Sequence, residues 1–189
     1  EVRGSPEMFV VKAFANFVGA TLVAILGGIS IAAEPLQDIY TTEDFAAEAS
    51  LARQAGVPLM VVFSTDDCPY CVRLKNQVLR PLVQNGKLSK KVLLREFNID
   101  IGGKVTDFDG ERVRSRVFVS RYDIYATPTV VLVDYDGEPL ATPIVGYNEP
   151  DAYTEQLNET IDSATMTLAA LRSPQFTAVV PGQSTPAAK

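Results

Sequence analysis

The stretch VPLMVVFSTDDCPYC, residues 57–71, decides the fold. Its first part, residues 57–64, is a short continuous apolar run rich in β-branched side chains, which predicts a buried central strand. The motif CPYC, residues 68–71, follows at once and opens a predicted helix that Pro81 is expected to kink or end. The sequence therefore predicts two cysteines at a strand-to-helix junction.

Cys68 and Cys71 are the only cysteines among 189 residues, and the sequence contains no histidine. A zinc site normally needs four ligands, so one cysteine pair cannot supply it. The lack of histidine also excludes a Cys-His or Ser-His-Asp nucleophile pair. We therefore expect neither a metal nor another cofactor, and we expect the thiols to react with each other or with a partner.

The spacing of the two cysteines assigns a role to each sulfur. Cys68 can occupy the N-cap with Pro69 at the first helical position, where a proline loses no hydrogen bond. Free backbone N–H groups and the helix dipole then stabilise a thiolate on Cys68, the predicted nucleophile. Cys71, one turn further on, would resolve the mixed disulfide. A Cys68–Cys71 disulfide closes a loop of only four residues and contributes about 2 kcal/mol as a purely structural bond, so the redox interpretation is favoured.

The rest of the chain alternates between helices and strands. Apolar periodicity predicts helices over residues 41–55, with Thr41 or Thr42 as the cap, and over residues 150–171. Residues 92–100 read as a second buried strand, and residues 113–122 as a short helix or a strand followed by one.

Two Asp-Gly pairs between alternating apolar residues each predict a hairpin. The first is Asp109-Gly110, and the second is Asp136-Gly137 between strands over residues 129–134 and 138–145. A parallel strand pair followed by an antiparallel hairpin predicts an α/β fold, with a central mixed sheet covered by helices on both faces.

Three motifs in this order resemble the thioredoxin superfamily: VVFSTDDCPYC at residues 61–71, FNID at 97–100 and ATPTVVLVDYDG at 126–137. The resemblance covers residues 41–171 and implies a thioredoxin fold and thiol–disulfide exchange. Within the family, VTDFDG at residues 105–110 is similar to exported bacterial thioredoxins of the sulfur-oxidation (SoxW) type.

The resemblance also implies a substrate-binding surface. It predicts a cis peptide bond between Thr127 and Pro128, facing the cysteines and leaving an open backbone edge for a substrate strand. Pro69 and Tyr70 would line the same surface.

One departure from the family concerns proton transfer. Thioredoxins place a buried aspartate six residues before the first cysteine, and a lysine beside the NID strand. This chain has Val62 and Glu96 at these positions. Our hypothesis is that Glu96 replaces the aspartate and accepts the Cys71 proton. The alternative is an exposed glutamate at the end of a strand.

The residues before the motif indicate the direction of electron flow. Strongly oxidising thiol–disulfide enzymes of the periplasm typically carry a histidine between their two cysteines, and this chain has none. Instead, Asp66 and Asp67 precede Cys68, and their negative charge disfavours a thiolate. This favours a reductase of disulfide-containing proteins, recharged by a membrane electron donor of the thiol-relay kind. The alternatives are a disulfide isomerase or oxidase, a glutaredoxin-like enzyme, or a non-catalytic thioredoxin-fold binding module.

The ends of the chain predict export to the periplasm. Residues 1–33 comprise seven residues upstream of Met8 and an apolar signal peptide, with a retained membrane anchor as the alternative. The thioredoxin-like domain is expected over residues 34–172, and residues 173–189 form a predicted disordered tail. The net charge is −6 and basic residues are scattered, so no nucleic-acid partner is expected.

Overall fold

The computed structural model describes residues 39–173. The predicted signal peptide or anchor and residues 174–189 of the predicted tail lie outside these residues. Within the described part of the chain, no helix is both long enough and apolar enough to cross a membrane.

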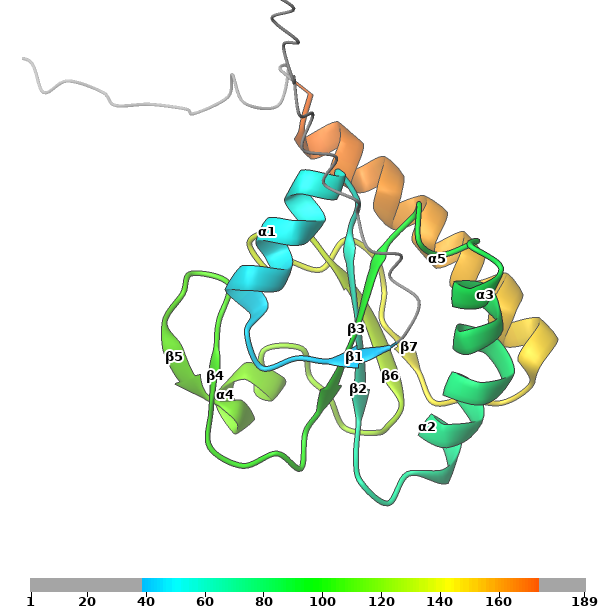
Figure 1. The fold of residues 1–189 in the computed structure, drawn as a ribbon, viewed down its shortest axis with the longest axis horizontal. Coiled ribbons are helices and arrows are strands. Elements are labelled where there is room, and N and C mark those ends of the chain that lie inside the picture. The colour runs from blue at the N-terminus through cyan, green and yellow to red at the C-terminus, as the bar shows by residue number, and fades with distance from the viewer. Residues whose placement is uncertain (1–38, 174–189) are drawn as a thin grey trace, which may run out of the picture. The chain divides into compact units, whose positions relative to one another are not determined.

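A five-stranded mixed sheet forms the centre of the fold (Figure 1). Its strands lie side by side in the order β1 (Tyr40–Thr41), β3 (Leu93–Asn98), β2 (Leu59–Ser64), β6 (Thr129–Val133) and β7 (Ile144–Val145). β1, β3 and β2 are parallel, whereas β6 runs antiparallel to both β2 and β7. The predicted mixed sheet is confirmed, and the short edge strand β1 is an addition that its two residues did not reveal.

The central strand β2 fixes where the cysteines lie. All six of its residues are buried, because β3 and β6 flank it and helices cover both of its faces. Its register with β3 runs from Leu59 opposite Leu93 to Ser64 opposite Asn98. The carboxyl ends of the two strands therefore meet at one edge of the sheet, and the segment with the cysteines starts there.

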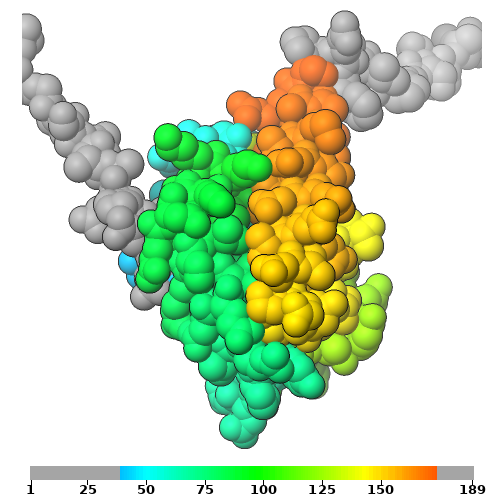
Figure 2. Space-filling model, turned by 90° about the vertical axis from the view of Figure 1, so that its right-hand side faces the viewer, coloured from blue at the N-terminus to red at the C-terminus, as the bar shows by residue number. Residues whose placement is uncertain are grey.

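One face of the sheet is covered by an aliphatic layer. The covering elements are α2 (Pro69–Leu74), the π-helical turn η1 (Lys75–Leu79), α3 (Arg80–Gln84) and α5 (Pro150–Leu171). Figure 2 shows the α2–α3 segment and α5 side by side over this face. Buried side chains from both layers form its core, among them Met60, Val62, Leu74, Leu94, Val130, Leu157 and Ile161.

The opposite face is aromatic. It is covered by α1 (Phe45–Ala55) and α4 (Ser115–Ser120). The Phe45 ring stacks on Phe118 with 4.2 Å between the ring centroids, and the Phe97 ring meets both of them edge-on at 5.5 Å. Helices thus cover both faces, as predicted.

The helix that starts at the cysteines continues past Pro81 to Gln84, so the predicted end of the helix at this residue is wrong. A proline inside an α-helix lacks an N–H donor, and its ring collides with the carbonyl four residues earlier. Here the π-helical turn η1 ends just before the proline, and Pro81 lies in the first turn of α3. The wider turn accommodates the proline within one continuous helical segment.

Residues 104–114 form a separate two-stranded sheet, the insertion hairpin. β4 (Lys104–Thr106) pairs antiparallel with β5 (Arg112–Arg114), and Gly110 takes a φ of 86° in the turn between them. The predicted Asp109-Gly110 hairpin is confirmed. α4 follows directly, so the alternative of a strand followed by a helix was the right one for residues 113–122.

Two predicted boundaries are corrected. The cap of α1 is Asp44, whose carboxylate accepts a hydrogen bond from the Ala47 N–H (3.0 Å), and Thr41 belongs to β1. The predicted strand over residues 138–145 is shortened to β7, Ile144–Val145. Pro139 and Pro143 lie in the lost portion, and a proline cannot donate a ladder hydrogen bond.

Candidate functional site

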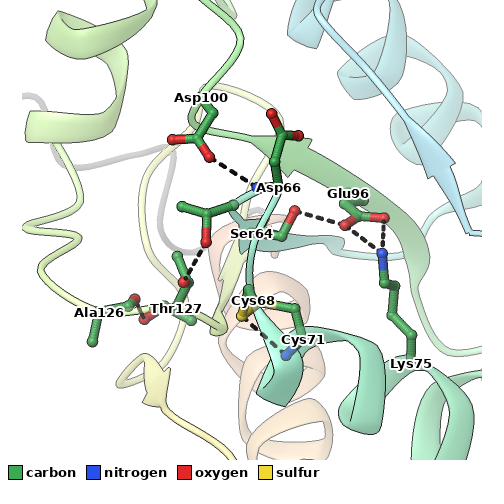
Figure 3. The surroundings of a disulfide bond; sticks show 11 residues. Ser64, Asp66, Cys68, Cys71, Lys75, Glu96, Asp100, Ala126 and Thr127 are labelled. Carbon is green, nitrogen blue, oxygen red and sulfur yellow. Dashed lines mark hydrogen bonds and ion pairs between the residues drawn. A yellow bond between two sulfur atoms is a disulfide. The ribbon is translucent and has the colours of Figure 1, made fainter.

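Cys68 and Cys71 form a disulfide at the start of α2 (Figure 3). Cys68 is the N-cap of the helix, with extended backbone and Pro69 in the first turn. Its Sγ accepts a hydrogen bond from the Cys71 backbone N–H, with 3.0 Å between the two atoms. Cys68 is 6% exposed and Cys71 2%. The first turn of the helix thus offers a donor to the Cys68 sulfur, and this donor can stabilise a thiolate after reduction.

Exposed carboxylates surround the turn that leads to the cysteines. The Asp66 N–H donates to the Asp100 carboxylate (2.8 Å), and the Asn98 side-chain amide donates to the Asp66 carboxylate. Asp67 lies next to Cys68 and is also exposed. We call Asp66, Asp67 and Asp100 the acidic rim. Asp100 was expected only as the end of a strand, and its place beside Asp66 follows from the parallel register of β2 and β3.

The loop that carries Thr127 and Pro128 is tied to the same end of β2. The peptide bond between these two residues is cis. The Thr127 hydroxyl lies 3.1 Å from the hydroxyl of Thr65, which directly follows β2. The Pro128 carbonyl accepts a hydrogen bond from the Gly146 N–H (2.7 Å). These contacts bring the loop before β6 beside the cysteine turn, although the two segments are almost 60 residues apart in sequence.

Pro69 and Tyr70 lie at the surface between the cysteines, and Tyr70 is 53% exposed. The Arg73 guanidinium lies over two rings, 5.8 Å from the Tyr70 centroid and 5.7 Å from the Tyr147 centroid. Burial raises the pKa of the Tyr147 phenol, and the charge of Arg73 opposes this shift. Tyr70, Arg73 and Tyr147 thus form an aromatic and cationic surface beside the disulfide. Sequence reasoning missed Arg73 and Tyr147, and the only signal was the spacing of three between Tyr70 and Arg73.

Glu96 lies in β3 beneath the helix of the cysteines. The carboxylate accepts a hydrogen bond from the Ser64 hydroxyl (2.6 Å), and Lys75 Nζ lies 2.8 and 3.0 Å from its two oxygens. The residue is 8% exposed, so the alternative of an exposed strand-end glutamate is wrong. Val62, the position where the family keeps its aspartate, is the register partner of Glu96 on the neighbouring strand.

Lys75, the partner of Glu96, lies on the helical segment that carries the second cysteine. It lies four residues after Cys71, and its backbone N–H donates to the Cys71 carbonyl. Residues four apart lie on one face of a helix, so the Lys75 side chain extends along the face that carries Cys71. Figure 3 shows the Glu96 carboxylate between Ser64 and Lys75. Among the described residues, the hydrogen bonds of this carboxylate go to those two side chains and not to a sulfur. Sequence reasoning missed both partners.

Across residues 39–173, no group of three or more His, Cys, Asp or Glu side chains is arranged to hold a metal ion. The described site offers a disulfide between Cys68 and Cys71, a helix N–H that can stabilise a thiolate, and the buried Glu96 carboxylate on the neighbouring strand.

Comparison with known proteins agrees with this geometry. A family model described as a thioredoxin-like domain matches residues 45–161. No curated protein sequence matches the chain.

Solved structures with a similar fold include three with low sequence identity. Thioredoxin h from poplar is 19% identical, with a TM-score of 0.43 over 60% of this chain and 85% of its own. The C-terminal domain of DsbD from Neisseria meningitidis, in the oxidised form, is 17% identical, with a TM-score of 0.44 over 61% and 90%. Mitochondrial thioredoxin 3 from Saccharomyces cerevisiae, also oxidised, is 20% identical, with a TM-score of 0.45 over 66% and 98%.

Proposed function

Because the chain belongs to the thioredoxin-like family, we propose that it is a protein-disulfide reductase that works by dithiol–disulfide exchange through Cys68 and Cys71. The observation that carries this proposal is the position of Cys68. Its sulfur caps α2, receives the Cys71 N–H and forms the disulfide with Cys71. A thiolate at this position is stabilised by the helix, and it can attack an external disulfide.

The proposed reaction proceeds in two exchanges. The Cys68 thiolate attacks one sulfur of the partner's disulfide, forms a mixed disulfide and releases the other partner sulfur as a thiolate. Cys71 then loses its proton and attacks Cys68 Sγ, which re-forms the Cys68–Cys71 disulfide and releases the second partner sulfur. Two electrons pass to the partner, and the protons of the dithiol end on its two thiols.

We propose that the Glu96 carboxylate accepts the proton that the Cys71 thiol loses. Its carboxylate is buried, lies beneath the helix of the cysteines and is bound to Lys75, which shares a helix face with Cys71. A positioned carboxylate within reach of a thiol, directly or through one water, can act as its general base. Ser64 fixes the carboxylate from the other side, at the end of β2.

The direction of electron flow is proposed from the acidic rim. Like charge near Cys68 disfavours its thiolate, and a strong oxidant needs an over-stabilised thiolate. Asp66, Asp67 and Asp100 are exposed, so solvent and salt screen their effect and leave it modest. The absence of histidine from the whole chain supports the same direction. We therefore place the protein with the reductases rather than with the oxidants or isomerases.

Export to the periplasm supplies the context of this proposal. The apolar segment at residues 13–31 supports a signal peptide or a membrane anchor. A reductase in an oxidising compartment must be recharged, and a membrane electron donor of the thiol-relay kind would supply the electrons. The partner that is reduced would be a protein with an accessible disulfide.

Insulin reduction by the dithiothreitol-charged protein tests the function. The wild-type chain is expected to reduce the insulin disulfides at a rate well above that of the Cys68→Ser variant. Equal rates for the two proteins would contradict the reductase proposal and would favour a non-catalytic binding module.

A further inference from the structure

A cavity of about 390 Å³ opens beside the insertion hairpin. We call it the basic pocket, and its lining comes from the loop before β4, the ends of the two hairpin strands and the start of α4: Gly102, Gly103, Lys104, Arg114, Ser115 and Arg116. A hydrogen bond from the Ser115 N–H to the Gly103 carbonyl (3.1 Å) holds its two sides together. Nothing in the proposed chemistry of the cysteines uses this pocket.

The charge of the pocket is uncompensated. Lys104, Arg114 and Arg116 are exposed cations, and among the described residues none of them forms an ion pair. Arg112 adds a fourth positive charge, since its guanidinium donates to the Lys104 carbonyl (2.9 Å). The buried carboxylate that follows β4, that of Asp107, is already paired with Arg121. This concentration of positive charge stands out in a chain with a net charge of −6.

Two of these cations lie opposite each other and destabilise the hairpin. Lys104 and Arg114 are direct register partners on β4 and β5, so their side chains leave the same face of the hairpin. Like charges directly opposite each other destabilise a strand pair. An anion between the two side chains would relieve this repulsion. The hairpin therefore has a physical reason to bind negative charge.

The Ser115 hydroxyl supplies a second and independent feature. Ser115 is 8% exposed and lines the pocket. Across residues 39–173, its hydroxyl makes no hydrogen bond, although its backbone N–H does. The hydroxyl oxygen is not among the fully buried unpartnered atoms of the described residues, so it is open to the pocket and free to donate. A carboxylate held by the cations would accept this hydrogen bond.

The pocket lies close to the redox centre. Figure 1 shows the loop between β3 and β4 at the same end of the sheet as the turn before α2. Asp100, which accepts the Asp66 N–H, is two residues before Gly102, and Asp66 is two residues before Cys68. Two residues of chain span at most about 7 Å. The path from the pocket to the cysteine therefore consists of the two-residue segment from Gly102 to Asp100, the hydrogen bond from Asp100 to Asp66, and the two-residue segment from Asp66 to Cys68. A protein whose disulfide is bound at Cys68 can therefore reach this region with residues that flank the disulfide.

We propose that the basic pocket docks an acidic segment of the disulfide-bearing partner, with a partner carboxylate between Lys104 and Arg114 and in contact with the Ser115 hydroxyl. The acidic rim lies between this pocket and Cys68, so the approaching partner meets two surfaces of opposite charge in succession. They steer a partner of complementary polarity and repel one that is acidic next to its disulfide. This inference rests on the proposed function, and it adds the class of partner.

The test compares two disulfide-linked peptides, one with glutamates four to eight positions from the cystine and one with glutamines there. Stopped-flow rates are measured for the dithiothreitol-charged protein at about 20 mM and about 0.5 M salt, because salt screens such contacts. We expect the wild type to reduce the glutamate peptide about 5-fold faster at low salt, with the ratio falling towards one at high salt.

The R114Q/R116Q double variant should lose this preference at low salt. The matched control is K87Q/K90Q, which removes the same charge from two exposed lysines in the turn before β3, at the opposite end of the sheet, and it should keep the preference. An equal preference in all three proteins, or none in the wild type, would overturn the docking inference.

A binding measurement separates this inference from the proposed function. Fluorescence anisotropy of a labelled glutamate peptide without cysteine should show tighter binding to the wild type than to R114Q/R116Q, whether or not either protein reduces disulfides. Binding without turnover would refute the reductase and leave the docking surface standing. Retention on phosphatidylglycerol vesicles, or competition by inorganic phosphate, without any preference for the glutamate peptide would overturn the docking inference in favour of a lipid surface or a small anion.

Discussion

Two buried carboxylates in this molecule are each paired with a cation in a similar way, but the two pairs have different roles. Glu96 with Lys75 lies beneath the helix of the cysteines, and Asp107 with Arg121 lies at the turn of the insertion hairpin. Both carboxylates are buried, at 8% and 2% exposure, and each is bound through both of its oxygens by one cation. The residue types in the two pairs therefore do not reveal that their roles differ.

The difference lies in the other contacts of each carboxylate. Asp107 also accepts the Phe108 N–H (2.8 Å), and its own N–H donates to the Glu111 carbonyl (2.8 Å), so it closes the hairpin turn and ties it to the end of α4. Burial acts to raise the pKa of Asp107, but the hydrogen bonds and charge of Arg121 outweigh it, and the pKa is lowered. Asp107 is thus held ionised as part of the structure. Glu96, in contrast, is joined to two side chains beside the redox helix.

The largest expected effect is that of Glu96→Gln. We expect the resolution of the mixed disulfide by Cys71 to slow by about 100-fold, since this is the lower range of a general base. Stopped-flow detection of the mixed-disulfide lifetime measures this step. Asp162→Asn removes a carboxylate from an exposed pair with Lys91 and serves as the control. An unchanged pH profile and lifetime in Glu96→Gln would show that Glu96 is structural, like Asp107.

Asp107→Asn should act on stability instead. The variant is expected to lose about 2 kcal/mol of unfolding free energy, less than the 3–5 kcal/mol of fully buried pairs, because Arg121 is 41% exposed. Urea unfolding followed by circular dichroism measures the change. Insulin reduction should stay at the wild-type rate, and a proportional loss of activity would remove the distinction between the two pairs.

The two Asp-Gly turns provide a smaller test of how firmly the hairpin is attached to the core. Gly110 and Gly137 have similar positive φ angles of 86° and 88°. A Cβ on Gly110 meets nothing within 4 Å, whereas a Cβ on Gly137 would lie 2.6 Å from the Phe108 ring. Since Phe108 packs on Phe45 and Phe118, its ring has little room to yield. Gly137→Ala should therefore cost about 1 kcal/mol more than Gly110→Ala, and equal urea midpoints would show that the ring moves freely.

The smallest effect concerns acid pH. Because the folded pKa of Asp107 is lowered, its contribution to stability is fully present above the unfolded value of about 3.9 and is lost as the pH falls through the folded pKa. Unfolding free energies measured between pH 5 and pH 2.5 should therefore fall less steeply in Asp107→Asn than in the wild type, by a few tenths to about 1 kcal/mol. If the unfolding free energies of the two proteins fell equally steeply with pH, the Asp107 carboxyl would have the same pKa in the folded and the unfolded chain.

The sequence predicts the main layers of this fold and the cysteine pair because these depend on local patterns. The apolar run of β2, the cap position of Cys68 and both Asp-Gly turns can be recognised within a few residues. The partners of Glu96 could not be predicted, because Ser64 and Lys75 meet it only through the register of β2 with β3 and the packing of η1.

Other features were missed for related physical reasons. A strand of two residues such as β1 has too little pattern to detect, and its pairing with β3 is a long-range contact. The π-helical turn before Pro81 leaves no compositional mark. Three cations of the basic pocket, Arg112, Arg114 and Arg116, alternate along one short segment, but only the register of the hairpin brings Lys104 opposite Arg114.

The reduction potential of the Cys68–Cys71 pair tests the proposed direction of electron flow most directly. It is measured by equilibrating the purified protein with glutathione or dithiothreitol redox buffers and quantifying the free thiols. The acidic rim and the absence of histidine predict a value closer to the roughly −270 mV of thioredoxin than to the roughly −120 mV of strong oxidants. A potential near −120 mV would contradict a reductase and would make the protein a disulfide donor.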